Sequence, residues 1–497
     1  MLLVIGYADM GTRLSIKKAL WVLVLILIAI AGCRVTNGGF AALVGFATII
    51  SITKRRYGVA GVGIGILALL QVTTSALIGA GFHMLIVKLM FCLIAPVFLM
   101  VPRLKRPSML VLPLGGLFVY LIYMVLPSAL GWFPMISYLK IALVLAYLSA
   151  LYFCAKAAQY DITEMEWLRA GLLAICMFVI LGSLVTIAMP SVGYSMQISK
   201  LQMWDANATA MDIGQKAGSV SLFSGVLFHS QCLAPIVAIA VGCVLCDMLF
   251  VEKKLRLLHL ITIGASPVLL YMTRSRTGLV ALFVELMFLW IWGIHRAPIS
   301  HKIRRIVGST MSVLIGLLAI ALIVLQIRQG TLTKWINKSE DSRAEVTVES
   351  VMFSRMGKVE QNLDEFKENP VIGKGFQTSP LHPVMYQQGL ITIFSAPIEK
   401  SIVPLVVLAE GGVIGAVIFL TFFVTFCVQC FRRRQLALLT IFLGMMASNL
   451  SEATCFSVSG TGGLLWALTL FGGLAVDYWT KVFNSQVKQG DFTLQGG

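Results

Sequence analysis

Two polar segments of an otherwise apolar chain carry the residues best suited to chemistry. Arg274 and Arg276 lie in a short turn, 273–278, between two apolar stretches, and Arg355 lies in the long polar segment 328–401. The arginine guanidinium presents a planar fork of donors that matches the oxygens of a phosphate group. We therefore expect these arginines to bind a phosphate-bearing ligand. Contacts with lipid headgroups or backbone carbonyls are the alternative for the turn.

Further polar residues lie later in the long segment. Gly373 and Gly375 bracket Lys374, and glycines allow the backbone to approach a bulky or anionic group closely, although the same pattern is common in ordinary turns. Glu399 and Lys400 form a charged pair at the point where the chain becomes apolar again. Such a pair is most often an interfacial anchor, and it also places a carboxylate at the membrane surface.

Three ionisable residues fall inside apolar stretches. Glu410 lies about two turns into the stretch after the long segment, and Lys88 and Glu285 lie within others. Because a charge at membrane depth is costly, such residues mark functional sites by default; pairing inside the bundle is the alternative for Lys88 and Glu285. His229 precedes another apolar stretch. A histidine there is more often packed than catalytic, and we include it as a candidate ligand-binding residue.

Arginines, a carboxylate at the membrane surface and the lack of a metal motif together favour one reaction class. A lipid-bound diphosphate would be held by the arginines while a base takes a proton from an acceptor hydroxyl. The arginines would stabilise the charge on the departing diphosphate, so we predict no metal site and no cofactor. The sequence contains no HExxH motif, no Walker loop and no dinucleotide fingerprint after a strand.

The composition indicates a membrane protein. Of 497 residues, 58% are hydrophobic and 12% charged, with a mean hydropathy of +0.89, whereas soluble domains carry about 25% charged residues. Apolar segments long enough to cross a bilayer recur from end to end. We predict an all-α polytopic bundle of about 12–14 transmembrane helices. The candidate spans are 19–33, 38–52, 58–79, 82–100, 109–126, 136–155, 167–188, 226–250, 257–272, 277–294, 306–327, 402–430, 435–449 and 460–479.

The net charge of +17 is explained by membrane topology. If both termini are cytoplasmic, alternating spans place most of the 39 lysines and arginines on the cytoplasmic side, as the positive-inside rule requires. Segments 189–225 and 328–401 then lie outside as a smaller and a larger periplasmic loop of a single membrane domain, 1–497. The larger loop holds equal numbers of basic and acidic residues. This distribution argues against nucleic-acid binding.

The larger loop contains a predicted amphipathic helix over residues 350–368. Val359, Leu363 and Phe366 belong to a series of apolar residues at helical spacing, whereas Asn362 projects elsewhere around the helix. We expect the apolar face to pack over the outer mouth of the bundle or along the membrane interface.

Three blocks of the sequence resemble those of a known family. The turn Thr273–Leu279 resembles an outer "SR(T/G)" turn, and Phe353–Phe376, FSRMGKVEQNLDEFKENPVIGKGF, resembles a segment of the form "SR…W…F…NP…GxG". Leu405–Gly415, LVVLAEGGVIG, resembles the helix "L…L.E.G.iG" that follows. In this order they are similar to the O-antigen ligase/O-antigen polymerase superfamily of integral membrane proteins of bacterial polysaccharide biosynthesis. The resemblance covers roughly residues 220–480.

The resemblance implies glycosyl transfer on the periplasmic side of the bacterial inner membrane. The donor would be a sugar chain linked to undecaprenyl diphosphate, and neither a metal nor a nucleotide sugar would be needed. By motif match, Arg276 and Arg355 would hold the diphosphate.

One position departs from the ligase pattern. Lipopolysaccharide ligases usually carry a histidine nine residues before the glutamate of the last block, and counting back nine from Glu410 gives Ser401. The usual base is therefore missing from its place. Glu399 would substitute as the catalytic base, with Lys400 assisting at the diphosphate, and His382 is a more distant alternative.

This departure favours a polymerase of O-antigen or exopolysaccharide over a ligase that transfers the glycan to lipid A core or another acceptor. A transporter or flippase of lipid-linked glycans is an alternative from another class. It predicts paired halves with broken helices at membrane depth, and no internal repeat is evident. A non-catalytic scaffold of a synthesis complex is a third class of function. Expected partners are the bilayer, the undecaprenyl-diphosphate-linked oligosaccharide and other polysaccharide synthesis and export proteins.

Overall fold

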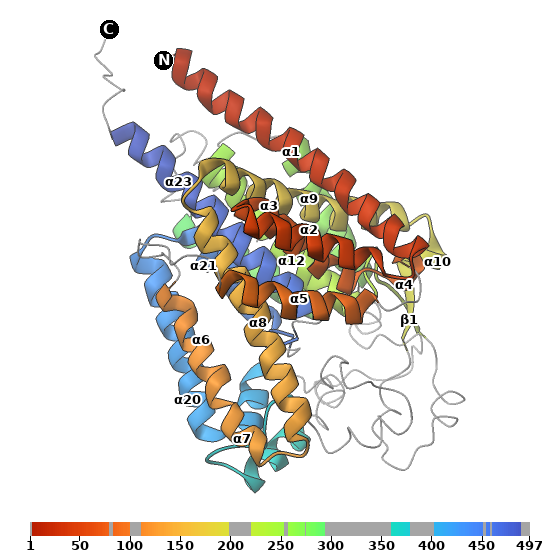
Figure 1. Ribbon diagram of the computed structural model, residues 1–497, viewed down its shortest axis with the longest axis vertical. Helices are drawn as coiled ribbons and strands as arrows, with labels where there is room; N and C mark the ends of the chain where they lie inside the picture. The colour runs from red at the N-terminus through yellow and green to blue at the C-terminus, as the bar shows by residue number, and fades with distance from the viewer. Residues whose placement is uncertain are drawn as a thin grey trace, which may run out of the picture.

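The computed structural model describes residues 2–78, 83–99, 111–197, 220–252, 257–273, 275–293, 359–377, 402–450, 454–457 and 460–488. Within these ranges the chain is helical, apart from one antiparallel ladder between β1 (Tyr194–Gln197) and β2 (Val220–Phe223). The predicted all-α bundle is confirmed, with this short ladder as an addition (Figure 1).

The helices follow the order of the predicted spans. The first part of the chain forms α1 (Leu2–Val35), α2 (Phe40–Thr53), α3 (Tyr57–Val72), α4 (Ser75–Ile78), α5 (His83–Leu99), α6 (Val111–Tyr123), α7 (Val125–Ala129), α8 (Pro134–Ala158), α9 (Ile162–Thr186) and α10 (Pro190–Gly193). After the ladder, the described residues form α-helices and three short π-helices, labelled η. They are α12 (Ser230–Cys246), η2 (Asp247–Glu252), α13 (Leu257–Thr273), α14 (Arg276–Phe288), η3 (Leu289–Gly293), α20 (Val403–Arg432), α21 (Leu436–Ser448), α22 (Thr461–Ala467), η4 (Leu468–Gly472) and α23 (Gly473–Lys488).

Many of these helices have the length and composition of membrane spans. Five in the described ranges are long and apolar enough to cross a bilayer: Ile16–Val35, Pro134–Ala158, Ile162–Thr186, Ser230–Val251 and Val403–Arg432. Shorter apolar helices occupy most of the other predicted spans. The predicted span 306–327 lies outside the described residues. Since a helix satisfies its own backbone groups, it is the form in which such segments enter lipid. The protein is a multi-pass membrane protein.

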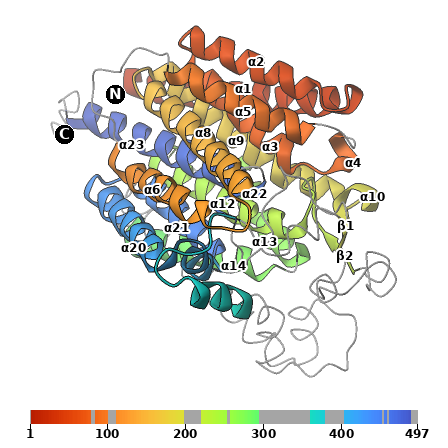
Figure 2. The ribbon, with the colours of Figure 1, turned by 60° about the horizontal axis from the view of Figure 1, so that its bottom comes forward.

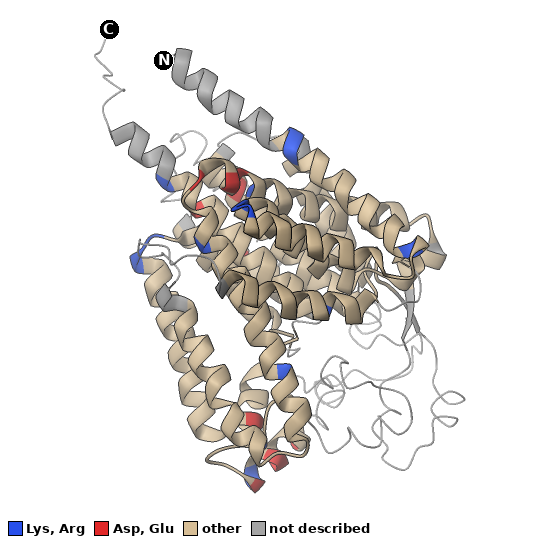
Figure 3. Cartoon of the chain, in the orientation of Figure 1, with Lys and Arg blue, Asp and Glu red and all other residues tan. Residues whose placement is uncertain are grey.

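The described bundle has two chemically different ends. Both termini lie at the end where α9 begins and α20 stops, which we call the termini end (Figure 1). At the opposite end, which we call the site end, α8, α12, α20 and α22 begin. Figure 3 shows lysines and arginines gathered toward the termini end, and a smaller mixed group of charges near α7 at the site end. Figure 2 turns the site end toward the viewer.

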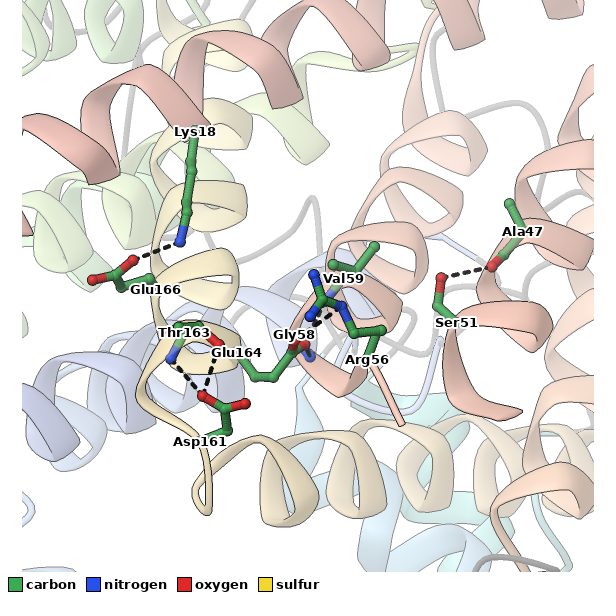
Figure 4. Close-up of polar contacts among 10 residues, drawn as sticks. All are labelled: Lys18, Ala47, Ser51, Arg56, Gly58, Val59, Asp161, Thr163, Glu164 and Glu166. Carbon is green, nitrogen blue, oxygen red and sulfur yellow. Dashed lines mark hydrogen bonds and ion pairs between the residues drawn. The ribbon is translucent and has the colours of Figure 1, made fainter. Parts of the chain in front are cut away.

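Ion pairs and helix caps tie the helices together at the termini end (Figure 4). Lys18 of α1 binds Glu166 of α9 at 2.5 Å, and the Arg56 side chain lies 3.4 Å from the Glu164 carboxylate. Asp161 caps α9 by accepting hydrogen bonds from the Thr163 hydroxyl at 2.7 Å and the Thr163 N–H at 2.8 Å. These contacts fix α1, α3 and α9 against one another.

Candidate functional site

A break in α20 organises the site end. Gly412 has φ 62° and ψ −166°, a conformation that is essentially restricted to glycine. The break interrupts the helical hydrogen-bond ladder about two turns into the helix, beside the buried Glu410. Backbone groups freed at membrane depth must find other partners.

Residues 370–375 of the large loop supply those partners. The loop and the broken helix are joined by four backbone hydrogen bonds, two in each direction. They run from the Lys374 N–H to the Ala409 carbonyl (3.0 Å), from Gly375 to Glu410 (3.0 Å), from Val413 to Pro370 (2.8 Å) and from Ile414 to Val371 (3.3 Å). The Tyr123 hydroxyl donates to the carbonyls of Gly411 at 2.8 Å and Ile372 at 3.2 Å. The loop and α20 therefore form one hydrogen-bonded unit.

The Gly-Lys-Gly stretch of this loop has clear intramolecular contacts. Gly373 has φ +89°, and a Cβ there would overlap the Glu410 carbonyl; a Cβ at Gly375, with φ +101°, would lie 2.9 Å from the Ser128 Cα. The Lys374 ammonium lies 2.5 Å from the Glu368 carboxylate and 5.2 Å from the centroid of the Trp132 ring. Packing thus accounts for both glycines. The assignment of Gly373, Lys374 and Gly375 to substrate binding stays a prediction.

Hydrogen bonds from α7 and α8 hold the end of the loop. The Phe376 N–H donates to the Ser128 hydroxyl at 3.0 Å, and the Ser137 hydroxyl donates to the Phe376 carbonyl at 2.8 Å. The buried Lys140 ammonium donates to the Gln377 carbonyl at 2.9 Å. This places a lysine of α8 next to the large loop, which the sequence pattern did not predict.

The described chain on either side of segment 378–401 is attached to the same connection, 449–457. The Gln377 side-chain amide donates to the Phe456 carbonyl at 2.8 Å, and the Val403 N–H donates to the Asn449 carbonyl at 3.1 Å. The Asn449 side-chain oxygen accepts hydrogen bonds from the N–H groups of Thr454 at 2.8 Å and Cys455 at 2.7 Å, which fixes the connection itself. Segment 378–401, which includes Glu399, Lys400 and Ser401, lies outside the described residues.

Glu410 is buried at the site end. It is 1% exposed and lies near the Tyr120 hydroxyl and the Cys455 thiol. The expectation that it lies inside a span is confirmed, since α20 includes it. Its role in substrate binding stays a prediction.

The arginine turn connects α13 to α14 at the site end. α13 ends at Thr273 and α14 starts at Arg276, and Ser275 and Thr277 are both buried. Gly278 brings α14 against α12, because a Cβ there would lie 2.7 Å from the Cβ of Ala234. Arg274 and the side chain of Arg276 lie outside what the structure describes.

His229 caps the neighbouring helix. Its Nδ1 accepts a hydrogen bond from the Gln231 N–H at 3.1 Å, in the N-cap position of α12. The Thr461 hydroxyl contacts the Cys232 sulfur at 2.7 Å, so α22 also begins here. Capping is a structural role for His229, and ligand binding by it stays a prediction.

The predicted amphipathic helix is present over residues 359–368. Asn362 and Glu365 are 2% and 5% exposed, whereas Leu363 is 38% exposed. Asn362 thus lies on a different face from Leu363, as the spacing predicted, and the polar face is the buried one. Of the two expected placements of the apolar face, the exposure of Leu363 favours the membrane interface, because polar side chains in a membrane protein turn toward the protein interior. Residues 350–358, including Arg355, lie outside the described residues.

Sequence reasoning missed the partners of the break in α20. Gly411 and Gly412 inside an apolar stretch were the available signal, and a Tyr123 hydroxyl inside another span was a second. Neither identifies residues 370–375, because the pairing joins segments that are distant in sequence.

Residues 260–420 match the family model described as O-antigen ligase. Over this region the chain is similar to O-antigen ligases. The match begins within α13 and contains the arginine turn, the 359–377 segment and α20 as far as Leu420. It confirms the resemblance inferred from the three sequence blocks. No curated protein and no solved structure matches the chain.

The O-antigen ligase match supports, in general terms, a function of the O-antigen ligase or polymerase type. The same match supports a glycosyltransferase-like enzyme role and a part in bacterial polysaccharide biosynthesis. A multi-pass protein of the inner membrane fits both the family and the apolar helices.

Proposed function

We propose that this protein is a polysaccharide polymerase that transfers a glycan from undecaprenyl diphosphate to an acceptor sugar. The observation that carries the proposal is the O-antigen ligase match over residues 260–420, which contain both arginine-bearing segments and the loop hydrogen-bonded to α20. The site end would face the periplasm and both termini the cytoplasm, as the distribution of basic residues favours. The whole chain, 1–497, would act as a single membrane domain.

The arginines are the proposed diphosphate ligands. Arg274, Arg276 and Arg355 would pair with the diphosphate oxygens of the donor, and Lys400 would assist. Glu399 would remove the proton of the acceptor hydroxyl as its oxygen attacks the anomeric carbon. The bond from that carbon to the diphosphate oxygen breaks, and undecaprenyl diphosphate leaves with its negative charge held by the arginines. Neither a metal nor a cofactor takes part in this scheme.

The described contacts support a fixed frame for these groups. Glu399 and Lys400 directly precede the point where Val403 binds the Asn449 carbonyl, and Arg276 opens a helix packed against α12. A rigid frame favours transfer because reacting groups must be held in one geometry.

Ser401 is the reason for preferring a polymerase to a ligase. The usual ligase histidine is replaced there, so transfer to lipid A core or another non-polymer acceptor is the second candidate. Transport of lipid-linked glycans is less well supported. The broken helix is the feature a transporter would use, yet four backbone groups around the break already pair with residues 370–375.

Purified protein in lipid, supplied with a lipid-diphosphate glycan, provides the direct test. Arg355→Ala and Glu399→Gln should abolish chain growth while the protein stays folded. Glu360→Gln is the matched control, because Glu360 is an exposed acid of the same loop and should leave activity unchanged. Full activity in Glu399→Gln would remove that residue as the base. Activity should also persist in excess chelator.

Surface polysaccharide from a deletion strain separates the two candidates. Loss of a polymerase should leave single repeat units, whereas loss of a ligase should leave long polymer on its lipid carrier. Unchanged polysaccharide in Arg276→Ala and Arg355→Ala strains that express the protein normally would instead favour a non-catalytic scaffold.

A further inference from the structure

Glu285 is a buried acid that the proposed reaction does not use. It lies in α14, about 13 Å along the helix axis from Arg276, and thus near the middle of the membrane. Its residue exposure is 0%, and neither carboxyl oxygen has a hydrogen-bond partner among the residues that the structure describes. Structural acids at such depth are normally paired, so an acid with no partner for either oxygen requires an explanation.

The neighbouring helices are shaped around this carboxyl group. Gly242 of α12 faces one oxygen, and a Cβ there would lie 2.5 Å from Oε2 of Glu285. Gly444 of α21 faces the other, and a Cβ there would overlap Oε1. The carboxyl therefore fills a notch that two helices leave open by carrying glycine. A side chain placed there by accident would not meet glycine on both sides.

Among the described residues, the surroundings of Glu285 contain no counter-charge for an ionised carboxylate. The titratable neighbours from the helices packed against it are the thiols of Cys243 and Cys246 on α12, with Cys176 of α9 next to Cys243. No lysine, arginine or histidine of the described ranges forms an ion pair with Glu285, and no group of three metal-ligating side chains is found in them. An unpaired carboxylate there would cost several kcal/mol or more.

We propose that Glu285 holds a proton in the membrane interior and is a site of modification by hydrophobic carbodiimides. These reagents react with protonated carboxyl groups. The carboxyl proton moves to one carbodiimide nitrogen while the carboxyl oxygen bonds to the central carbon, giving an O-acylisourea. The acyl group then migrates to nitrogen, giving a stable N-acylurea from which no atom has left.

α14 presents one face to lipid and another to the bundle. Val280 and Phe283 are 45% and 42% exposed, so a carbodiimide dissolved in the bilayer meets the outer face of α14, and it reaches the buried Glu285 when α14 separates transiently from α12 and α21. The bulky adduct would separate α14 from α12 and α21, whose packing closes on the carboxyl. Because α12 and α14 begin at the site end, the adduct should also displace the arginine turn.

Peptide mass spectrometry of the full chain in lipid nanodiscs tests the proposal. After treatment with dicyclohexylcarbodiimide, Glu285 should carry roughly tenfold or more adduct than Glu164 or Asp247, because each of those two carboxyl groups is paired with an arginine and Glu285 is not. Equal labelling of the three acids, or none at Glu285, would overturn it. This comparison uses the wild-type chain only and measures no glycan transfer, so its outcome is independent of the proposed function.

The variant Glu285→Gln provides a second test of where the carbodiimide reacts. Glu285→Gln keeps the size and neutrality of the protonated acid, so it should fold normally and carry no adduct in that peptide. If the glycan-transfer assay is active, carbodiimide should inactivate the wild type and spare Glu285→Gln. Adduct at the same peptide in the glutamine variant would place the reaction on another residue and refute the assignment.

Discussion

Replacing Gly412 with alanine tests the pairing between α20 and the large loop most directly. The residue combines φ 62° with ψ −166°, and an added Cβ would overlap the Val371 carbonyl and approach the Ile372 nitrogen at 2.6 Å. Alanine can therefore be accommodated only if the loop moves away from the helix or the backbone changes conformation.

The expected size of the effect follows from these contacts. A non-glycine residue in this region of backbone space costs about 1–3 kcal/mol. Displacing the loop also breaks the bonds to Pro370 and Val371, each worth about 1 kcal/mol net. Together they give about 4 kcal/mol, which is roughly a thousandfold change in the local opening equilibrium.

Amide hydrogen exchange in lipid nanodiscs measures that equilibrium. In Gly412→Ala the N–H groups of Lys374 and Gly375 should lose roughly a thousandfold of their protection. Gly411→Ala is the neighbouring control, since its Cβ would come closest to the Met124 sulfur, at 3.2 Å, with a Tyr123 ring carbon in ordinary contact at 3.7 Å, and the flexible methionine side chain can adjust. Gly115→Ala, where no atom lies within 4 Å, should change nothing or stabilise α6 slightly.

Two results would refute the reasoning. A loss of protection below about tenfold in Gly412→Ala would mean that the loop does not depend on the break. Equal losses in Gly411→Ala and Gly412→Ala would mean that the effect comes from general crowding rather than from the backbone conformation.

Three further predictions concern other polar contacts. Tyr123→Phe removes the hydroxyl that serves two carbonyls and should cost about 1–3 kcal/mol, seen as reduced exchange protection in the same loop. Arg169→Ala leaves the buried Asp247 without its two hydrogen bonds of 2.7 and 2.9 Å and should cost about 3–5 kcal/mol, measured by thermal unfolding in detergent. Hydrogen bonds from the Thr163 hydroxyl and backbone lower the pKa of Asp161 from its ordinary 3.8. Its capping contribution is therefore present above about pH 4 and lost as the pH falls through the lowered pKa, and Asp161→Ala should remove that step from a stability-versus-pH curve.

The sequence was sufficient for the helical bundle because apolar segments leave the chain few other structures in lipid. The predicted span 136–155 lies within α8, and all of the predicted span 402–430 except Ile402 lies within α20. It was insufficient where distant segments meet. The span predicted at 58–79 is divided into α3 and α4, because the N–H of Thr74 donates to the Val226 carbonyl at 2.9 Å. No local pattern around Thr74 signals that partner.

The candidate site, like the fold, was only partly predictable from the sequence. Glu410 and Glu285 were singled out because ionisable residues at membrane depth are rare, and both are buried. The sequence left the orientation of the helix at 359–368 open, because spacing identifies a helical face without saying whether protein or lipid covers it. In the structure Asn362 is on the buried face and Leu363 on the exposed one.

The attachment of both flanks of segment 378–401 to one connection has a consequence for how this protein can diversify. Gln377 and Val403 are held by Phe456 and Asn449, so the described chain on both sides of the segment is anchored at one place. Lengthening such a segment adds little to the entropy of closing it, about 0.6 kcal/mol for each doubling. The length and sequence of segment 378–401 can therefore vary at little cost to the stability of the bundle. Relatives could replace it wholesale, and with it the groups that meet the acceptor sugar, while the membrane bundle stays the same.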